Sequence, residues 1–424
     1  DNNDVLSKSI GASFVFSDLV KEVAPWLSYG KIRAAWGEIP QALGLTSTTF
    51  GAYRYPGFNY SPAQNQWNGN ILMGTPNQVV DSAIRGAVKT QKEVGLELRF
   101  LRNRLGFSAT YWDGTEEGLP YAITTNGASG FTSKLINLGK ITKKGIDIQF
   151  NARPVWGQNF QWEINGTYGR LIENQVVSIH PDVSRIPVEG VWGTTAPYMV
   201  HEEGKRWGQI YGNGIKRIDG QPVLDNQGRY VSEPNVYFGS VLPDYTGGVQ
   251  NSFTFLRDFS VNVNIDYQVG GKFVSLSDMW GSYSGLTART ATVNDKGNPI
   301  RDAVADGGGM HVFGVDADGK PVDYYVEAQD YFHNLYGRNA FDEFVYDLTF
   351  VKLREFSIGY NLPLEKLGIS NWMQRATVSL VARNPFLIYA KTKDIDPSEV
   401  SNVSGETGNY PGTRGFGFNL RVGF

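Results

Sequence analysis

Cysteine is absent from this sequence of 424 residues. Disulfide bridges, zinc–thiolate sites, iron–sulfur clusters and thiol nucleophiles are therefore excluded. The chain also has no run of ~18 consecutive apolar residues, which excludes a transmembrane helix. Its first residues, Asp1-Asn2-Asn3-Asp4, are acidic and polar where a signal peptide would carry a basic segment and an apolar core. If the chain is exported, we expect it to be a mature form or a fragment.

An excess of charge of one sign is lacking as well. Lys and Arg number 39 against 42 Asp and Glu, for a formal net charge of -3. This near balance gives no electrostatic reason to expect a nucleic acid as partner. Charged residues make up 19% of the chain, below the globular norm of about 25%. Aromatic residues make up 13% and Gly occurs 50 times, so the composition favours strands and turns over helices.

The segment Phe416–Phe424 shows what is present instead. Its apolar side chains alternate with small or polar ones at Gly417, Asn419, Arg421 and Gly423. Side chains two positions apart in a strand lie on one face, so this segment has an apolar face and a polar face. Bacterial outer-membrane barrels place such faces against lipid and against an aqueous lumen.

The same alternation recurs along the whole chain. It is found in Ile10–Ser17, Ile32–Trp36, Val94–Phe100, Leu105–Tyr111, Ile146–Ala152, Phe160–Tyr168, Val249–Phe255, Phe259–Val269, Phe356–Leu362, Ala376–Ala382 and Phe416–Phe424. We therefore predict an all-β fold, an antiparallel transmembrane β-barrel with about eleven strands in this chain.

The predicted connections between these strands are alternately short and long, which is typical of outer-membrane barrels. The long ones run from Glu38 to Ala87, Gly114 to Lys134, Glu173 to Leu242, Gly270 to Tyr346 and Leu387 to Pro411. A closed barrel of one bacterial chain has an even number of strands, so about eleven would be half of a 22-stranded plugged barrel. Trp207–Ile215 and Gly228–Tyr237, inside Glu173–Leu242, also look extended. One further strand there would make the number of strands even, and the argument for half a barrel would no longer hold.

The long connections are rich in aromatic residues, in which disordered segments are poor. Trp and Tyr suit stacking on sugar rings or packing against peptide side chains. The candidate substrate-binding residues are Trp67, Trp192, Trp207, Trp280, Tyr283 and Tyr331. The alternative is that these rings fold the loops onto each other or dock a partner protein. Rings at strand ends are expected to form interfacial girdles instead, namely Trp26, Trp36, Trp112, Trp162, Tyr168, Tyr267 and Tyr360.

Polar residues expected to face the lumen are candidates for the solute path: Glu97, Arg99, Asp147, Asn264 and Asp266. The alternative is that they hold a plug domain inside the barrel. The four histidines lie in long connections, and no Gly-x-Ser-x-Gly, His-Glu-x-x-His or phosphate-loop motif occurs. Asp316-Ala317-Asp318-Gly319 fits a tight turn better than a calcium loop. We therefore expect no enzyme activity, no cofactor and no metal site.

Several motifs resemble those of SusC/RagA-type TonB-dependent outer-membrane transporters. The most specific is Phe350-Val351-Lys352-Leu353-Arg354-Glu355-Phe356-Ser357-Ile358-Gly359-Tyr360-Asn361-Leu362-Pro363. Similar to further family motifs are Asn137–Asp147, Gly239–Gly248, Asp394–Pro397 and Tyr410–Arg414. Ala382-Arg383-Asn384-Pro385-Phe386 also resembles a family motif, but Pro385 departs from the family pattern, which has an apolar residue after that Asn. The resemblance extends over residues 1–424 but implies only the C-terminal portion of the barrel, without the plug, the TonB box and the N-terminal strands.

The resemblance implies active import of oligosaccharides or oligopeptides across the bacterial outer membrane, energised through TonB. The implied partners are a SusD-like surface lipoprotein, TonB through the missing N-terminal region, the remainder of the same barrel and the lipid bilayer. Alternatives are a passive porin, a secreted β-rich glycan-binding adhesin and a barrel-embedded hydrolase.

Overall fold

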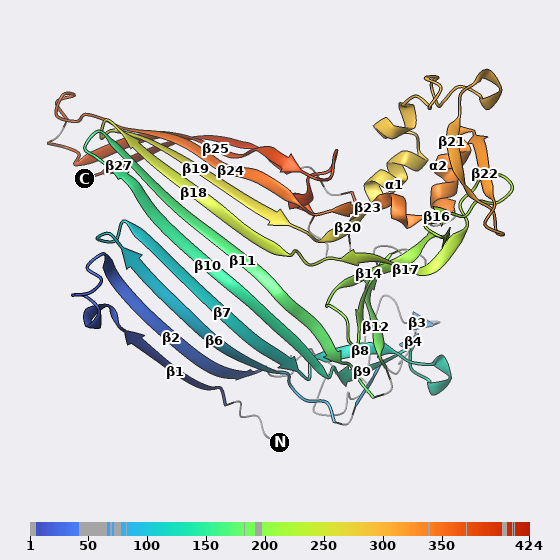
Figure 1. Ribbon diagram of the computed structural model, residues 1–424, viewed down its shortest axis with the longest axis horizontal. Coiled ribbons are helices and arrows are strands. Elements are labelled where there is room, and N and C mark those ends of the chain that lie inside the picture. Colours follow the sequence, from blue (N-terminus) through green and yellow to red (C-terminus); the bar gives the residue numbers. More distant parts are fainter. Residues whose placement is uncertain are drawn as a thin grey trace. The chain divides into compact units, whose positions relative to one another are not determined.

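Eleven antiparallel strands form the largest sheet of the protein, seen here in a computed structural model (Figure 1). The structure describes residues 6–41, 66–67, 70–71, 78–81, 83–181, 183–190, 197–337, 340–369, 371–400, 405–408, 410 and 412–424. The sheet follows chain order: β1 (Lys8–Val15), β2 (Leu27–Pro40), β6 (Val88–Phe100), β7 (Leu105–Glu117), β10 (Lys140–Trp156), β11 (Phe160–Ser178), β18 (Tyr245–Phe255), β19 (Phe259–Val269), β24 (Phe350–Asn361), β25 (Arg375–Ala390) and β27 (Gly415–Gly423). The predicted antiparallel strands are thereby confirmed; β19 has the predicted bounds, and β10 and β11 are longer than predicted.

The chain divides into two compact units. The first comprises Asp1–Ile148, Leu171–Ile186 and Glu202–Arg206, and the second comprises Gln149–Arg170, Pro187–His201 and Trp207–Phe424. Within the second unit, β18, β19, β24, β25 and β27 lie side by side as consecutive antiparallel neighbours (Figure 1).

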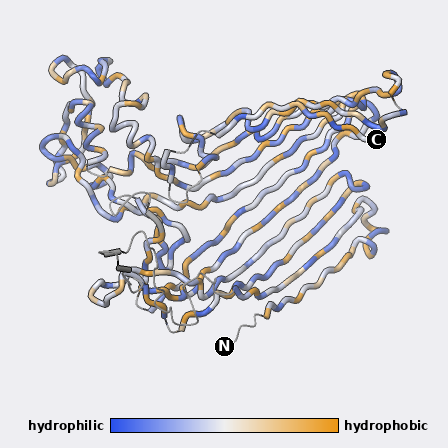
Figure 2. Tube along the Cα trace, turned by 180° about the vertical axis from the view of Figure 1, so that it is seen from behind, coloured by the Kyte–Doolittle hydropathy of each residue, from blue (hydrophilic) through white to orange (hydrophobic). Residues whose placement is uncertain are grey.

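Apolar and polar residues alternate along these strands (Figure 2). The apolar side chains of the sheet are widely exposed: Ile10 by 71%, Leu380 by 61% and Phe418 by 67%. A water-soluble domain rarely exposes so many large apolar side chains on one surface, whereas a membrane-facing sheet does. The alternation therefore produces the apolar face that the sequence predicts.

Aromatic rings flank this apolar face in the second unit. At the short-turn end, the ring of Phe160 lies 5.1 Å from that of Phe255, and Trp162 stacks on Phe253 at 5.8 Å. At the other end, the ring of Tyr245 lies 5.6 Å from Tyr168 and 6.4 Å from Tyr267. The strand segment between the two groups, tilted as barrel strands are, spans roughly 25 Å, the height of an outer-membrane apolar band.

The long connections carry secondary structure of their own. Three of the small sheets have two strands each: β3 (Gln66–Trp67) with β4 (Asn70–Ile71), β15 (Arg217–Ile218) with β16 (Gln221–Pro222), and β21 (Met310–Val315) with β22 (Pro321–Val326). Two have three strands each: β5 (Gln78–Val80), β9 (Ser133–Asn137) and β8 (Pro120–Thr124), and β23 (Val345–Asp347), β20 (Lys272–Ser275) and β26 (Gly405–Glu406). The four-stranded sheet contains β12 (Arg185–Gly190), β13 (Tyr198–Glu202), β14 (Gln209–Ile215) and β17 (Ser232–Ser240). The α-helices are α1 (Leu276–Tyr283) and α2 (Ala328–Gly337). Short 3-10 segments are η1 (Ser17–Leu19), η2 (Gly127–Ser129), η3 (Ala288–Ala291), η4 (Val304–Asp306), η5 (Phe341–Phe344) and η6 (Pro397–Glu399). Among the described helices, none has the length and apolar character needed to span a bilayer.

A hydrophobic core lies in the long connections of the second unit. Met279 of α1, Leu335 of α2 and Phe344 of η5 are at most 1% exposed and belong to one cluster. These connections therefore fold as packed structure around buried apolar side chains and are not loose loops.

Candidate functional site

The polar face of the sheet in the first unit carries paired charges. Lys31 Nζ of β2 lies 3.1 Å from Glu97 Oε2 of β6, and Arg99 Nη2 donates to Glu97 Oε1 at 2.8 Å. Arg33 Nη1 lies 3.9 Å from Glu93 Oε2. The structure thus brings the solute-path candidates Glu97 and Arg99 together, in a cluster whose charges compensate one another.

Asp147 of β10 accepts a hydrogen bond from Trp112 Nε1 of β7 at 2.9 Å, and Trp112 pairs in register with Glu93 of β6. Alternation in β7 places Trp112 on the opposite face from Phe107 and Tyr111, which are 37% and 44% exposed. The prediction that Trp112 belongs to an interfacial girdle is therefore wrong, because its indole lies on the polar face and donates a hydrogen bond to Asp147.

In the second unit, Asn264 and Asp266 lie two residues apart on β19 and so share a face. Asn264 is exposed and pairs in register with Glu355 of β24. Asp266 Oδ2 accepts a hydrogen bond from Arg354 Nε at 2.7 Å. Asp266 Oδ1 is buried and has no hydrogen-bond partner among the described residues.

Arg354 is a candidate residue that the sequence analysis missed. The β19–β24 pairing passes from Glu355 to Leu353 without it, so Arg354 is the extra residue of a bulge. In the neighbouring strand β25, Asn384 adopts a left-handed φ of 47° and its Oδ1 lies 3.4 Å from Arg354 Nη1. A signal was available, because the adjacent charges of Arg354 and Glu355 interrupt the alternation at this point.

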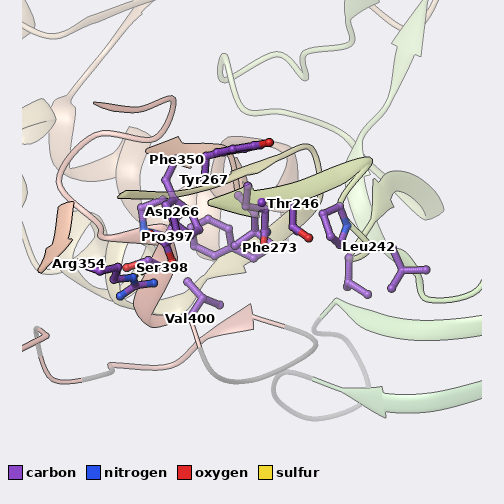
Figure 3. Close-up of a pocket in the computed structure, with 15 residues that line it drawn as sticks. Leu242, Thr246, Asp266, Tyr267, Phe273, Phe350, Arg354, Pro397, Ser398 and Val400 are labelled. Carbon is purple, nitrogen blue, oxygen red and sulfur yellow. Dashed lines mark hydrogen bonds and ion pairs between the residues drawn. The ribbon is translucent and has the colours of Figure 1, made fainter. Parts of the chain in front are cut away.

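Asp266 and Arg354 border a pocket of about 610 Å³ in the second unit (Figure 3). Its walls come from β18, β19 and β24 near the long connections, and from residues 241–243, Phe273, Leu348, Pro397, Ser398 and Val400. Figure 3 shows Arg354, Asp266 and Ser398 toward one end, Leu242 at the other and Phe273 between them. Phe350 and Val400 lie near the Asp266–Arg354 pair, so polar and apolar side chains are mixed along the pocket.

A buried lysine holds the segment that forms one wall of this pocket. Lys352 of β24 is 3% exposed, and its Nζ donates to Asp396 Oδ2 at 2.9 Å, to Ser398 Oγ at 2.7 Å and to Glu399 Oε1 at 2.7 Å. Burial acts to raise the pKa of Asp396, but hydrogen bonds from Lys352 and Ser398 outweigh it and hold that pKa below its ordinary value. The η6 segment is therefore tied to the sheet by charge-assisted hydrogen bonds.

Two of the aromatic candidates, Trp280 and Tyr283 of α1, come together with two rings of α2. The Trp280 ring lies 4.9 Å from that of Tyr336, and Tyr283 stacks on His333 at 4.2 Å. A second pocket, of about 560 Å³, lies beside them and is lined by Tyr283, His333 and Arg301 among others. This group of rings offers planar surfaces next to hydrogen-bonding side chains.

Two other aromatic candidates serve local packing. The ring of Tyr331 lies 6.2 Å from that of Tyr230, and burial raises the pKa of the Tyr331 hydroxyl. Trp207 stacks on His201 with ring centroids 3.2 Å apart. The structure does not bring Trp207 or Tyr331 into the group formed by Trp280 and Tyr283.

The side chains of the last two aromatic candidates, Trp67 and Trp192, are not among the described parts of the structure. Trp67 lies in β3, but its side chain is outside the described part of the structure. Trp192 lies outside the described residues altogether. A substrate-binding role for the aromatic candidates remains a prediction.

The histidines do not converge on a reactive centre. His201 is buried, and burial lowers its pKa to about 4. His311 lies between two carboxylates, 3.1 Å from Asp295 and 2.8 Å from Asp323, while His333 stacks on Tyr283. Over the described ranges, no group of three or more His, Cys, Asp or Glu side chains could hold a metal ion.

Curated proteins resemble the chain in sequence, although no protein-family model matches it. TonB-dependent receptor P3 of Formosa agariphila is 22% identical over 399 residues, which cover 85% of this chain and 36% of the receptor. TonB-dependent receptor P26 of the same bacterium is 23% identical over 374 residues, covering 78% of this chain and 34% of the receptor. The chain is a homologue of the TonB-dependent receptors. It spans about a third of the length of these relatives.

Solved structures share the fold of this TonB-dependent receptor homologue. The RagAB peptide importer in its closed-closed state matches 98% of the chain with a TM-score of 0.69 and 17% identity, over 43% of the importer chain. The open-open state also gives a TM-score of 0.69. The predicted family, the antiparallel barrel-type fold and the bacterial outer-membrane location are thereby confirmed. These relatives are named as receptors and importers and not as enzymes.

Proposed function

We propose that this chain is the C-terminal portion of the barrel of an active outer-membrane nutrient importer. One observation carries the proposal: the apolar-faced, 11-stranded sheet and its long connections match an importer chain over 98% of the length of this chain. In this proposal the remaining strands, the plug and the segment that contacts TonB belong to other parts of the same protein.

The proposed cargo is an oligopeptide or an oligosaccharide. A peptide cargo is supported by the fold shared with a protein named as a peptide importer. The rings of Trp280, Tyr283 and Tyr336, with hydrogen-bonding groups beside them, would also suit a sugar chain. Cargo would enter on the side of the long connections, where both described pockets lie.

The proposed partners are a SusD-like surface lipoprotein and TonB. The lipoprotein would cap the long connections, and TonB would supply energy from the proton-motive force. The charged cluster around Glu97 and the Asp266–Arg354 pair would face the plug or the passing cargo, because each lies on the polar face of the strands in its own unit.

The test is uptake by cells that lack or regain the full-length protein. Fluorescently labelled oligopeptides and oligosaccharides are offered with and without a protonophore. We expect uptake of one class only when the protein is present, and its loss when the protonophore is added. Uptake that survives the protonophore would identify a passive porin, and surface binding without uptake would identify an adhesin.

A further inference from the structure

We propose that Lys272 and Lys391 bind a phosphate group of a glycolipid in the outer leaflet of the membrane. The two lysines belong to the second unit and lie where its strands leave the apolar band, on the side of the long connections. The inference uses the outer-membrane location of the sheet and goes beyond the proposed import of nutrients.

Lys391 lies directly beyond the aromatic girdle of the lipid-facing surface. Val351 of β24 pairs with Tyr267 of β19 on one side and with Tyr389 of β25 on the other, so the girdle continues from β19 to β25. Lys391 follows Tyr389 by two residues, and its N–H donates to the carbonyl of Thr349 at 3.1 Å, which extends the strand pairing. Two residues of a strand span roughly 7 Å, so Lys391 lies at the level of the lipid headgroups.

Lys272 reaches the same place from β20. It pairs in register with Asp347 of β23, whereas the next residue, Phe273, is 1% exposed and lines the pocket described above. Successive side chains of a strand lie on opposite faces, so Lys272 and Asp347 face away from that pocket. Lys272 Nζ lies 3.1 Å from Asp347 Oδ2, and Lys391 Nζ lies 2.9 Å from the same oxygen. The two ammonium groups are therefore neighbours, at the place where β20, β23 and the end of β25 meet (Figure 1).

These three side chains leave one positive charge in excess. Burial acts to raise the pKa of Asp347, but hydrogen bonds from Thr349, Lys391 and Lys272 outweigh it and hold that pKa far below its ordinary value. Asp347 therefore stays ionised, holds the two ammonium groups together and neutralises the charge of only one. Each ammonium group has three donors and gives one to Asp347, so donors remain for the oxygens of a phosphate.

The surroundings of the two lysines favour a lipid phosphate over a soluble anion. Phe386, Ile388 and Tyr389 of β25 are 52%, 48% and 52% exposed, so an apolar surface for acyl chains reaches up to Lys391. Lysines next to a membrane-spanning apolar surface attract the anionic headgroups at that depth. In the outer leaflet of a bacterial outer membrane these headgroups are phosphorylated sugars, and the two ammonium groups suit the phosphate.

The experiment uses the full-length protein in a mild detergent, and native mass spectrometry measures how tightly it retains added lipid. The probes are phosphorylated lipid A and the same lipid A without its phosphates, with inorganic phosphate as a competitor. Lys272→Met/Lys391→Met removes both cations of the site, and Lys272→Arg/Lys391→Arg keeps both charges.

Lys8→Met/Lys320→Met is the matched control variant. Both lysines are exposed, and they pair with separate carboxylates, Glu38 and Asp318, so their charges are compensated one to one. Heat-modifiable migration in gels verifies that each variant forms a folded barrel.

We expect the unmodified protein to bind phosphorylated lipid A at least about tenfold more tightly than the dephosphorylated form, because charge-assisted hydrogen bonds are added. The Met variant of the site should bind both forms equally within about twofold, whereas the control variant and the Arg variant should keep the preference.

Equal binding of both forms by the unmodified protein, or a preference that persists in the Met variant of the site, would overturn the inference. Displacement of the lipid by inorganic phosphate, but not by chloride at the same ionic strength, would assign the two lysines to a soluble anion and would also overturn it. The uptake assay tests the importer function separately, because lipid binding requires neither cargo nor energy.

Discussion

At the scale of single residues, the large sheet sorts side chains by the solvent that each face meets. Asn251 is an instructive exception, because alternation places it on the apolar face with Val249 and Phe253. Trp162 Nε1 of the neighbouring strand donates to Asn251 Oδ1 at 3.1 Å. A polar group can therefore occupy the apolar face when a local partner satisfies it.

The first prediction compares two adjacent residues of β19. Val263 lies midway between Phe259, near the short-turn girdle, and Tyr267, in the other girdle. Val263→Arg should lower the free energy of unfolding by about 2–4 kcal/mol, because a guanidinium would enter the middle of the lipid-facing band. Asn264→Arg should change it by less than about 1 kcal/mol, since this side chain is exposed on the polar face. Urea unfolding of the full-length protein in phospholipid vesicles measures both, and equal losses would refute the assignment of the faces.

The second prediction concerns His201, whose burial lowers its pKa to about 4. Its Nε2 is buried and without a partner in the described structure, so the ring stays neutral in the folded state. In the unfolded chain the ring gains a proton near pH 6.5, and stability is therefore fully present above that pH and is lost as the pH falls toward 4. The loss should reach at most about 3 kcal/mol for local opening of β13 and β14.

Hydrogen exchange of β13 and β14 measured from pH 7.5 to pH 4 tests this prediction. His201→Phe keeps a ring against Trp207 and should remove the pH dependence. His333→Phe, at the stack with Tyr283, should retain it. An identical pH profile in His201→Phe and in the unmodified protein would contradict the prediction.

Single residues also mark the limit of what the sequence could predict about the site. Alternation picked out Asp266, because a carboxylate flanked by Ile265 and Tyr267 stands out from its neighbours. The adjacent charges of Arg354 and Glu355 interrupt the alternation, but they do not show where the Arg354 side chain lies, because its position depends on a bulge in β24 that shifts the pairing with β19. The contact between these two side chains joins residues 88 apart in the chain, and no local pattern reports it.

At the scale of elements, the strands could be predicted and the long connections could not. A strand between lipid and water has a period of two that its own sequence displays, as in Phe259–Val269. The structure of the connections depends on distant contacts instead. The N-terminus of α1, for example, is held by Glu406, whose Oε1 accepts a hydrogen bond from Ser277 Oγ at 2.6 Å, across 129 residues of sequence.

The third prediction concerns the attachment of η6 to β24. Lys352→Met removes the three hydrogen bonds of the buried ammonium and leaves Asp396 and Glu399 without their shared cation. Because both carboxylates are about a third exposed, the local destabilisation should be about 2 kcal/mol, below the value for a fully buried pair. Hydrogen exchange of residues 394–400 should accelerate accordingly. Lys391→Met, which removes a pair between the exposed Lys391 and Asp347, is the control and should change exchange by less than about 1 kcal/mol.

At the scale of the whole molecule, one sheet provides both a membrane surface and a polar wall. Its edge strands β1 and β27 each have a single neighbour in the described strand order. An odd strand count cannot close a bacterial barrel, which agrees with our proposal that further strands belong to the same protein. The long connections carry a core and pockets of their own, so substitutions there can reshape these pockets while the strands keep their pattern.

The most direct test of the lipid-facing surface is an accessibility scan along β19. This chain contributes no cysteine of its own, so single cysteines introduced from Ser260 to Gln268 can each carry a nitroxide spin label in a full-length protein whose other cysteines, where present, are replaced by Ser, reconstituted into vesicles. We predict that labels at Val261, Val263, Ile265 and Tyr267 collide with membrane-dissolved oxygen, whereas labels at the residues between them collide with a water-soluble nickel complex. Equal accessibility of neighbouring positions to both reagents, or protection of both faces from both, would contradict a sheet with lipid on one side and an aqueous interior on the other.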